Sequence, residues 1–458
     1  MIPKKIAAAL GLLFIIASCE MIAVNHPADQ WKIHTPDVWK AANSMESTRI
    51  ATHWLEDCQD ADLTKLVNEA MKANQDLQAT AARLRAAKQS PIIARANLLP
   101  RLNASNSASQ SFRSDGDDDR YGLNLSASWE IDLWGRLRDL QNATVADFDA
   151  AVAQFRGARL SLAALTTKSY ANFISASQQL RLAEETQTSF EKNLRIIERN
   201  YKAGVPNVRA LDVQLGRSNV SAAQRVSRDR QLERDNAARS LEILLGRYPS
   251  ASIAQKDDLP KISQRVAVGI PANIIERRPD LVAARARLYA SARRADAARK
   301  NLLPSLSLTG STGETTNNFT KLLELDSLVS QLGANLTQNL FTGGENPAEA
   351  RAALERNRAA IHDYAQLCLE AFREIETTLA TEHSLAEQET FLRKEVEQAA
   401  LAEKQSERDY SEGLEGAEIL SVLESQRRAN NARSSLIRLR NQRFQARIDL
   451  HLALGGSF

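Results

Sequence analysis

The fold of this chain is decided by residues 136–203, which read RLRDLQNATVADFDAAVAQFRGARLSLAALTTKSYANFISASQQLRLAEETQTSFEKNLRIIERNYKA. The stretch contains no proline and a single glycine, Gly157, and its apolar residues recur at helical spacing. As one α-helix it would extend roughly 100 Å at about 1.5 Å per residue, about three times the hydrocarbon thickness of a bilayer. No compact globule needs a helix of that length, so the sequence predicts a rod.

The rod is predicted to turn back at Ala203-Gly204-Val205-Pro206. The glycine supplies a helix C-terminal turn, and the proline starts a new element. A second helical pattern then returns over residues 208–245. Residues 136–246 are therefore expected to form a long antiparallel helical hairpin.

The same hairpin is expected a second time, at residues 345–455. Residues 348–412 again lack glycine and proline, and a turn follows at 413–416. Tyr201 and Gly204 recur 209 positions later as Tyr410 and Gly413, and the Asn-Leu-Leu-Pro of 97–100 recurs at 301–304. We therefore expect two tandem repeats, 62–260 and 280–455, joined by a linker at 261–279 and followed by a tail at 456–458.

The first residues, 1–18, have the features of a lipoprotein signal peptide. Lys4 and Lys5 precede an apolar run that is too short to span a bilayer as a permanent helix. The run ends in Ile16-Ala17-Ser18-Cys19, a pattern after which bacteria acylate the cysteine, so Cys19 is expected to be the lipidated mature N-terminus. The next residue is not the aspartate associated with retention at the inner membrane, which favours the outer membrane.

Residues 19–61 are expected to form an irregular segment that lies over the folded body and is anchored by Trp31, Trp39 and Trp54. Cys58, in this segment, and Cys368 occupy unrelated places in the repeat. They are therefore expected to be ordinary small apolar residues rather than disulfide partners.

The composition excludes several classes of function. The net charge of +3 gives no reason to expect a nucleic-acid partner. No Cys/His spacing indicates a metal site, and no nucleophile, base and orienting group can be identified. A phosphate-binding glycine loop is absent as well. The sequence therefore predicts a protein that is not an enzyme and has no cofactor apart from a covalent lipid on Cys19.

Alternating segments after each Asn-Leu-Leu-Pro indicate a membrane part. From Leu123 to Leu133 every odd residue is apolar or small and every even residue is polar, which is the length and pattern of a transmembrane β-strand. A soluble strand has the same period, but the very polar loop at 114–120 favours an exposed hairpin between two spanning strands. The expected strands are 101–112, 121–133, 305–313 and 328–341; Gln338 breaks the apolar face of the last one.

Four strands cannot span a membrane alone, because an open sheet leaves its edge amides and carbonyls unpaired in lipid. Membrane barrels begin at about eight strands, and an eight-stranded barrel is filled by its own side chains. Three copies, with twelve strands, are the smallest number that leaves a lumen. The predicted fold is mainly α with a membrane β-barrel part, assembled as a homotrimer.

Residues 269–281, GIPANIIERRPDL, resemble the linker between the repeats of TolC-like outer-membrane efflux proteins, in the lipoprotein branch that serves resistance-nodulation-division pumps. The most specific phrase is ERRPD at 276–280, and YSEG at 410–413 and LSVLESQR at 420–427 also match. The resemblance covers essentially the whole mature chain. It departs from the family at residues 53–58, where members usually have an aromatic-rich phrase.

This resemblance implies a trimer with a twelve-stranded barrel in the outer membrane and a twelve-helix tunnel in the periplasm, docked to an adaptor protein and an inner-membrane pump. The chain would then be the passive exit duct of a tripartite efflux system. Leu420 and Glu424 lie four residues apart on one helical face and match the family positions that form the periplasmic gate. The expected adaptor contacts are the hairpin tips, Ala203, Gly204, Val205, Glu412, Gly413 and Leu414.

Other interpretations share parts of this pattern. A lipid-anchored periplasmic coiled-coil scaffold would have the same signal and helices, but no use for the alternating strands. An exit duct for protein secretion would share the whole outer-membrane architecture, because the substrate is set largely by the partner pump. Leu420 and Glu424 could equally be a coiled-coil seam and a solvated face. The family resemblance favours the efflux duct and the gate.

Overall fold

The computed structural model describes residues 39–41, 54–112, 118–205, 208–254, 256–261, 274–318, 328–412, 414 and 418–456. The chain divides into two compact units. The first consists of residues 1–34, 83–152 and 283–366, and the second of residues 35–82, 153–282 and 367–458. Cys19, Trp31 and Gly413 lie outside the described residues.

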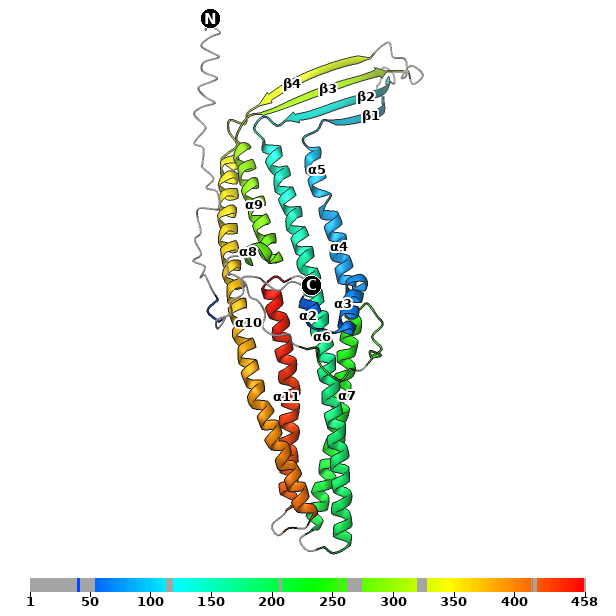
Figure 1. The fold of residues 1–458 in the computed structure, drawn as a ribbon. Helices are drawn as coiled ribbons and strands as arrows, with labels where there is room; N and C mark the ends of the chain where they lie inside the picture. Colours follow the sequence, from blue (N-terminus) through cyan, green and yellow to red (C-terminus); the bar gives the residue numbers. More distant parts are fainter. Residues whose placement is uncertain are drawn as a thin grey trace. The chain divides into compact units, whose positions relative to one another are not determined.

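The first unit holds a four-stranded antiparallel sheet in the order β1-β2-β3-β4 (Figure 1). Its strands are β1 (Arg101–Ser111), β2 (Asp118–Ile131), β3 (Ser305–Thr316) and β4 (Val329–Thr337). The central pair, β2 and β3, joins the strands of the two repeats. Each repeat therefore contributes one hairpin of strands, as the sequence predicts.

The register places the apolar residues of neighbouring strands on one face of this sheet. Rows on that face are Ile131, Leu306 and Leu336; Trp129, Leu308 and Ala334; and Leu102, Ala127, Gly310 and Leu332. Rows on the other face are polar: Glu130, Ser307 and Asn335; and Asn103, Ser126, Ser311 and Gln331. Leu332 is 90% exposed in a single chain. The sheet therefore has one continuous apolar face, and this face is exposed in a single chain.

Side chains from the strand ends fix both Asn-Leu-Leu-Pro turns. The indole Nε1 of Trp129 donates to the carbonyl of Leu98 at 3.0 Å, and the Nε2 of Gln338 donates to the carbonyl of Leu302 at 2.9 Å. The two bonds join corresponding positions of the repeats. The sequence predicted that Gln338 interrupts the apolar face of the last strand, and this is wrong. β4 ends at Thr337, and Gln338 instead closes the turn.

Several predicted boundaries shift for identifiable reasons. β2 begins at Asp118, inside the predicted loop, and ends at Ile131 because Asp132 leaves the strand to cap the next helix. Its carboxylate accepts the N–H groups of Leu137 and Arg138 at 3.0 and 2.9 Å. The helical pattern before Asn97 is interrupted at residues 88 and 89, and Pro91 lies in the first turn of α5 (Ser90–Ala96). Within the described chain no helix has both the length and the apolar character to cross a bilayer.

The long helices show the repeat most directly. Those of the first repeat are α6 (Arg136–Lys202) and α7 (Ala210–Leu244), and those of the second are α10 (Glu345–Ser411) and α11 (Ile419–Ala453). α6 and α10 both have 67 residues, and α7 and α11 both have 35. The first residues of α6 and α10, and of α7 and α11, lie 209 positions apart, so residues related by that offset are called counterparts below.

Shorter helices complete the fold. They are α2 (Trp54–Asp57), α3 (Ala61–Ala73), α4 (Gln75–Ala87), α8 (Ile274–Arg277) and α9 (Pro279–Lys300). Asn74 separates α3 from α4, and its side-chain oxygen accepts the N–H of Leu77 at 3.0 Å. The segment expected to be irregular contains α2, which the sequence did not indicate.

The core of the second unit gathers side chains from both repeats. Trp54, Leu63, Ile174, Leu241 and Phe444 are each at most 1% exposed in one cluster. Trp39 is buried against Phe372, with ring centroids 6.1 Å apart. Two of the three predicted tryptophan anchors therefore pack against the helices. Cys58 and Cys368 are buried and not joined to each other.

Candidate gate and docking tips

The first hairpin turns through a motif that favours glycine. Gly204 has φ +69°, and its N–H donates to the carbonyl of Tyr201 at 3.1 Å. The N–H of Val205 donates to the carbonyl of Asn200, also at 3.1 Å, which completes a Schellman motif. No atom lies within 4 Å of the position that a Cβ on Gly204 would take. Ala203, Gly204 and Val205 are exposed, as an adaptor contact requires.

The second hairpin repeats the motif 209 positions later. The N–H of Leu414 donates to the carbonyl of Asp409 at 3.1 Å, which is the counterpart of the bond from Val205 to Asn200. Glu412 and Leu414 are exposed, and Glu412 forms an ion pair with Arg408 at 2.9 Å. Two of the three predicted contacts on this tip are therefore accessible.

An apolar cluster of side chains joins the two hairpins near their tips. It contains Ile197 of α6, Val213 of α7, and Ile419 and Val422 of α11, all buried, with Tyr410 packed against them. The charge of Asp212 and the burial of the ring together raise the pKa of Tyr410; burial is the larger cause. These buried residues form the contact between α6, α7 and α11 near the hairpin tips.

Leu420 does not belong to that buried contact. It is 51% exposed, whereas Ile419 and Val422 on either side of it are 7% and 2% exposed. Its counterpart Leu211 is 56% exposed. Within one chain the apolar side chain of Leu420 therefore points away from the contact between the helices. A residue that forms a constriction between copies would be exposed in this way.

Glu424 has two close partners of opposite charge on its own helix. Its carboxylate forms ion pairs with Arg428 at 2.7 Å and with Arg427 at 2.8 Å. Hydrogen bonds from Arg428 and then Arg427 lower the pKa of the Glu424 carboxyl. The i+3 and i+4 spacings were visible in the sequence and could have revealed these pairs. Each carboxylate is accompanied by two guanidinium groups, so the local charge is positive.

The described residues contain no group of three or more His, Cys, Asp or Glu side chains that could hold a metal ion. What the structure displays is a sheet with one apolar face, two long helical hairpins and exposed hairpin tips. These features define a subunit of a membrane channel with a long helical extension.

The family described as "Outer membrane efflux protein" matches residues 66–247 and 270–456, and the chain belongs to this family. OprJ of Pseudomonas aeruginosa, an outer membrane protein, is 31% identical over 444 residues, which cover 92% of this chain and 90% of OprJ. SilC of Salmonella typhimurium, a probable outer membrane lipoprotein, is 25% identical, covering 98% of each chain.

The solved structures agree on the fold. The CmeC outer membrane channel of Campylobacter jejuni aligns with a TM-score of 0.87 at 23% identity, covering 95% of each chain. The mainly helical fold with two repeats is thereby confirmed, as is the family that the linker phrase indicated. The chain is an outer-membrane efflux channel protein, a transporter component rather than an enzyme.

Proposed function

We propose that three copies of this chain form a passive exit duct, with a twelve-stranded barrel in the outer membrane and a twelve-helix tunnel in the periplasm. An adaptor protein would open the duct, and an inner-membrane pump would supply the energy. The observation that carries this proposal is the sheet of the first unit, which combines an exposed apolar face with open edges at β1 and β4.

The open edges require partners in lipid. Each unpaired backbone group in the hydrocarbon region costs on the order of several kcal/mol, so β4 of one copy is expected to pair with β1 of the next. The apolar residues of β2 occupy alternate positions over 123–131, which corresponds to roughly 25–30 Å at about 3.3 Å per residue. That length suits the apolar band of a membrane barrel, about 25 Å tall. The polar rows would then face the lumen.

A lipid on Cys19 is the second part of the proposal. The description of SilC as a probable lipoprotein supports it, together with the sequence around Cys19. Intact mass of membrane-extracted protein should show an acylated Cys19 at the mature N-terminus, and an unmodified Cys19 would contradict the proposal. Cys19→Ser should weaken anchoring without abolishing barrel insertion, because the barrel holds the membrane independently.

The gate and the adaptor contact are the third part. Leu420 from three copies would form an apolar ring, and Glu424 a charged ring one turn away. The hairpin tips at 203–205 and 412–414 would contact the adaptor, because they are exposed ends of long helices. Membership of an efflux family favours this duct over a periplasmic scaffold and over a duct for secreted proteins.

The test of the assembly is the mass of the particle in mild detergent, measured by light scattering. We expect three chains per particle. Deletion of residues 123–133 should abolish both the trimer and membrane insertion, because the deletion removes a central strand. A monodisperse monomer of the intact chain would refute the duct. Oligomers that persist in the deletion variant would instead support a scaffold held together by its helices.

A further inference from the structure

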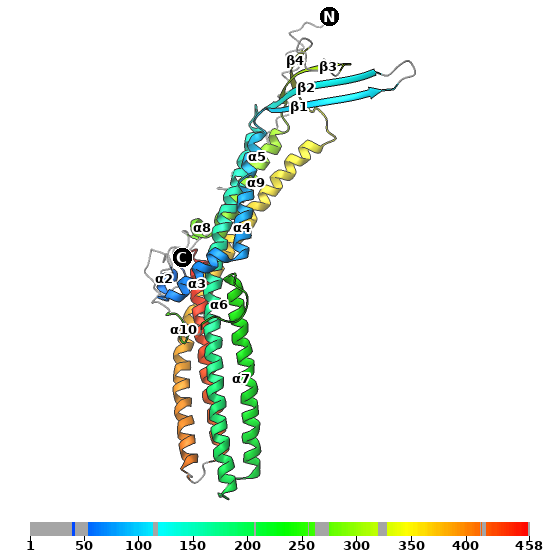
Figure 2. The same ribbon diagram turned by 90° about the vertical axis from the view of Figure 1, so that its right-hand side faces the viewer.

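The two helical hairpins of the second unit turn back at the same end of that unit (Figure 2). Close to the turns, a pocket of about 350 Å³ lies between α6, α10 and α11. We call it the tip pocket. It borders the apolar cluster that joins the hairpins, because Ile419 and Val422 line the pocket and also belong to the cluster. The tip pocket therefore has walls from both repeats.

Basic side chains from both repeats line the tip pocket. They are Lys192 of α6 and Lys404 and Arg408 of α10, whereas Glu407 is the one acidic residue among the described residues of its lining. Glu407 Oε1 already accepts a hydrogen bond from Gln426 Nε2 at 2.6 Å, and Arg408 is held by the ion pair at the second tip. Within the described part of the chain, neither lysine has an ion-pair partner. The pocket therefore carries positive charge that the chain does not neutralise.

A buried amide adds a neutral donor to the same pocket. Asn193 lines the pocket next to Lys192, and its Nδ2 is buried without a hydrogen-bond partner among the described residues. A buried N–H group is unfavourable unless it finds an acceptor. Two ammonium groups and this amide can therefore donate hydrogen bonds to one ligand that carries acceptor oxygens.

The donors on α6 are not part of a surface that both repeats share. Lys192-Asn193 of the first hairpin has Leu401-Ala402 as its counterpart in the second. One turn closer to the tip, the two hairpins do carry the same pair, Glu-Arg at 198–199 and at 407–408. The lysine and the amide are thus specific to the helix that forms the first wall of the tip pocket.

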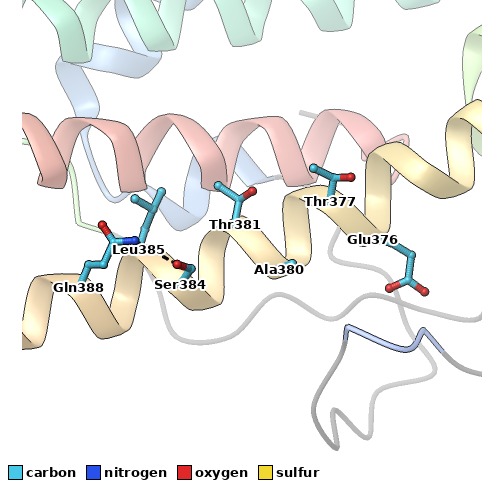
Figure 3. Close-up of a pocket in the computed structure, with 7 residues that line it drawn as sticks. All are labelled: Glu376, Thr377, Ala380, Thr381, Ser384, Leu385 and Gln388. Atoms are coloured by element: carbon cyan, nitrogen blue, oxygen red, sulfur yellow. Dashed lines mark hydrogen bonds between the residues drawn. The ribbon is translucent and has the colours of Figure 1, made fainter.

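A second pocket, on α10, has the opposite character (Figure 3). Its volume is about 540 Å³, and Glu376 is the one charged residue among the described residues that line it. The carboxylate of Glu376 accepts the N–H groups of Lys40 and Ala41 at 2.9 and 2.8 Å. This larger pocket offers no cation to a ligand, so size alone does not distinguish the tip pocket; its charge does.

We propose that the tip pocket binds a compact organic anion with two or more carboxylate or phosphate groups. One acidic group pairs with Lys192 and the amide of Asn193, and another pairs with Lys404, because hydrogen bonds between charged partners are the stronger ones. A volume of about 350 Å³ lies at the small end of the range of ligand pockets. The inference goes beyond the proposed duct, since the whole site lies within one chain and needs no second copy.

A bound anion connects α6 of the first repeat to α10 of the second and so holds the hairpins together. It does not sit on the side of Leu420 and Glu424. At about 100° per residue, the midpoint of those two lies about 150° around α11 from the midpoint of Ile419 and Val422. The anion therefore acts on the contact between the hairpins, and it favours the conformation in which they touch.

Calorimetric titration of the full-length protein in a neutral detergent tests the site. The probes are citrate and inorganic pyrophosphate, in about 0.15 M salt so that unspecific attraction is screened. We expect at least one of them to bind saturably, with one molecule per chain, and to raise the melting temperature. Lys192→Gln/Lys404→Gln should weaken binding by about ten-fold or more. Asn193→Asp, which places a carboxylate where the amide donates, should weaken it as well.

The matched control is Arg195→Gln/Arg199→Gln, which removes the same charge from exposed positions of α6 outside the pocket. It should change the affinity by less than about two-fold, because exposed charges are screened by salt. Light scattering of each sample separates the site from the assembly. Saturable binding by a particle with the mass of one chain would refute the duct and support the tip pocket.

Three results would overturn the proposal. The first is that neither probe binds saturably. The second is an equal loss of affinity in the control, which would show a general attraction to basic helices. The third is that neither probe binds while Lys192→Gln/Lys404→Gln weakens cross-linking to the adaptor. That result would assign the two lysines to an acidic segment of the adaptor instead of a free anion.

Discussion

The two helical hairpins have the same backbone and different chemistry at their tips. Helix lengths agree, and the turn bonds of Val205 and Leu414 are counterparts. Yet Leu215 of the first hairpin stands where the second has Glu424. A repeated backbone needs only helical periodicity and a glycine at the turn, so the exposed side chains of the tips are free to differ.

The difference extends to how each returning helix begins. Asp212, 4% exposed, accepts the N–H of Arg209 at 2.8 Å and so satisfies a backbone donor at the start of α7. Its counterpart is Ser421, and Glu418, the residue before α11, forms no side-chain cap hydrogen bond. A buried carboxylate thus holds the start of the returning helix in the first hairpin, and a serine stands at the corresponding position of the second. This difference favours the second hairpin as the one that carries the gate.

The largest expected effect comes from blocking a tip. Gly204→Trp should reduce efflux by about ten-fold or more, since a loss of about 1.4 kcal/mol in adaptor binding is already ten-fold. The side chain enters open space, and the positive φ costs only about 1–2 kcal/mol, so the trimer should persist. Adaptor cross-linking and export of the pump's substrate from cells measure the effect, and Gly413→Trp tests the other tip.

A matched control for this variant is Gly343→Trp. Gly343 also has a positive φ, +62°, and no atom lies within 4 Å of the position that its Cβ would take, but this glycine lies between β4 and α10. The control variant should keep adaptor cross-linking. Wild-type transport in both tip variants would show that neither tip carries the contact.

The next effect distinguishes the counterparts Leu420 and Leu211. Leu420→Ser should raise single-channel conductance in planar bilayers several-fold, because a hydroxyl lets water enter an apolar constriction. Leu211→Ser, at an equally exposed leucine, should leave conductance near wild type. An equal response of the two variants would mean that the gate does not belong to the second hairpin alone.

A smaller effect concerns ion selectivity. Without its partners, a ring of Glu424 carboxylates would favour cations, and Glu424→Gln would only lower that preference. Arg427 and Arg428 flank each carboxylate. Glu424→Gln should therefore shift the reversal potential in the direction of anion preference, and Arg428→Gln should shift it in the direction of cation preference. The depressed pKa of Glu424 keeps it ionised, so the wild-type value should be constant between about pH 7 and pH 5. Unchanged selectivity in both variants would place Glu424 off the conduction path.

The sequence was sufficient for the features that depend on local pattern. The repeats, the turn at Gly204 and the alternation of β2 follow from helical period, glycine placement and strand period. The ends of elements were harder to predict, because they depend on contacts with distant residues. Gln338 could not be recognised as the residue that closes the turn at Leu302, and the roles of Asp132 and Asn74 as caps emerged only with the helices in place.

The smallest expected effect compares two buried counterparts near the ends of α7 and α11, Glu242 and His451. Burial raises the pKa of Glu242, but N–H groups of Ala251 and Ser252, at 2.7 Å each, outweigh it and lower the pKa below 4.5. His451 stacks on Trp54, with centroids 6.0 Å apart, and burial and then Arg447 lower its pKa from 6.5 to about 4. The fold therefore favours an ionised carboxylate at one position and a neutral imidazole at the other.

The two positions should respond to different pH windows. The stability that depends on neutral His451 is complete above about pH 6.5 and is lost as the pH falls toward 4, by about 2 kcal/mol at pH 5. The contribution of Glu242 is lost only as the pH falls from about 4.5 through its depressed pKa, below the range compared here. Melting temperatures in detergent should therefore fall between pH 7.5 and pH 5 in the wild type, and His451→Phe, which keeps an aromatic ring against Trp54, should flatten that slope. Glu242→Gln should lower the melting temperature at both pH values and leave the slope unchanged, because it removes hydrogen bonds that are present throughout this range. A slope that persists in His451→Phe would assign the acid sensitivity to another group.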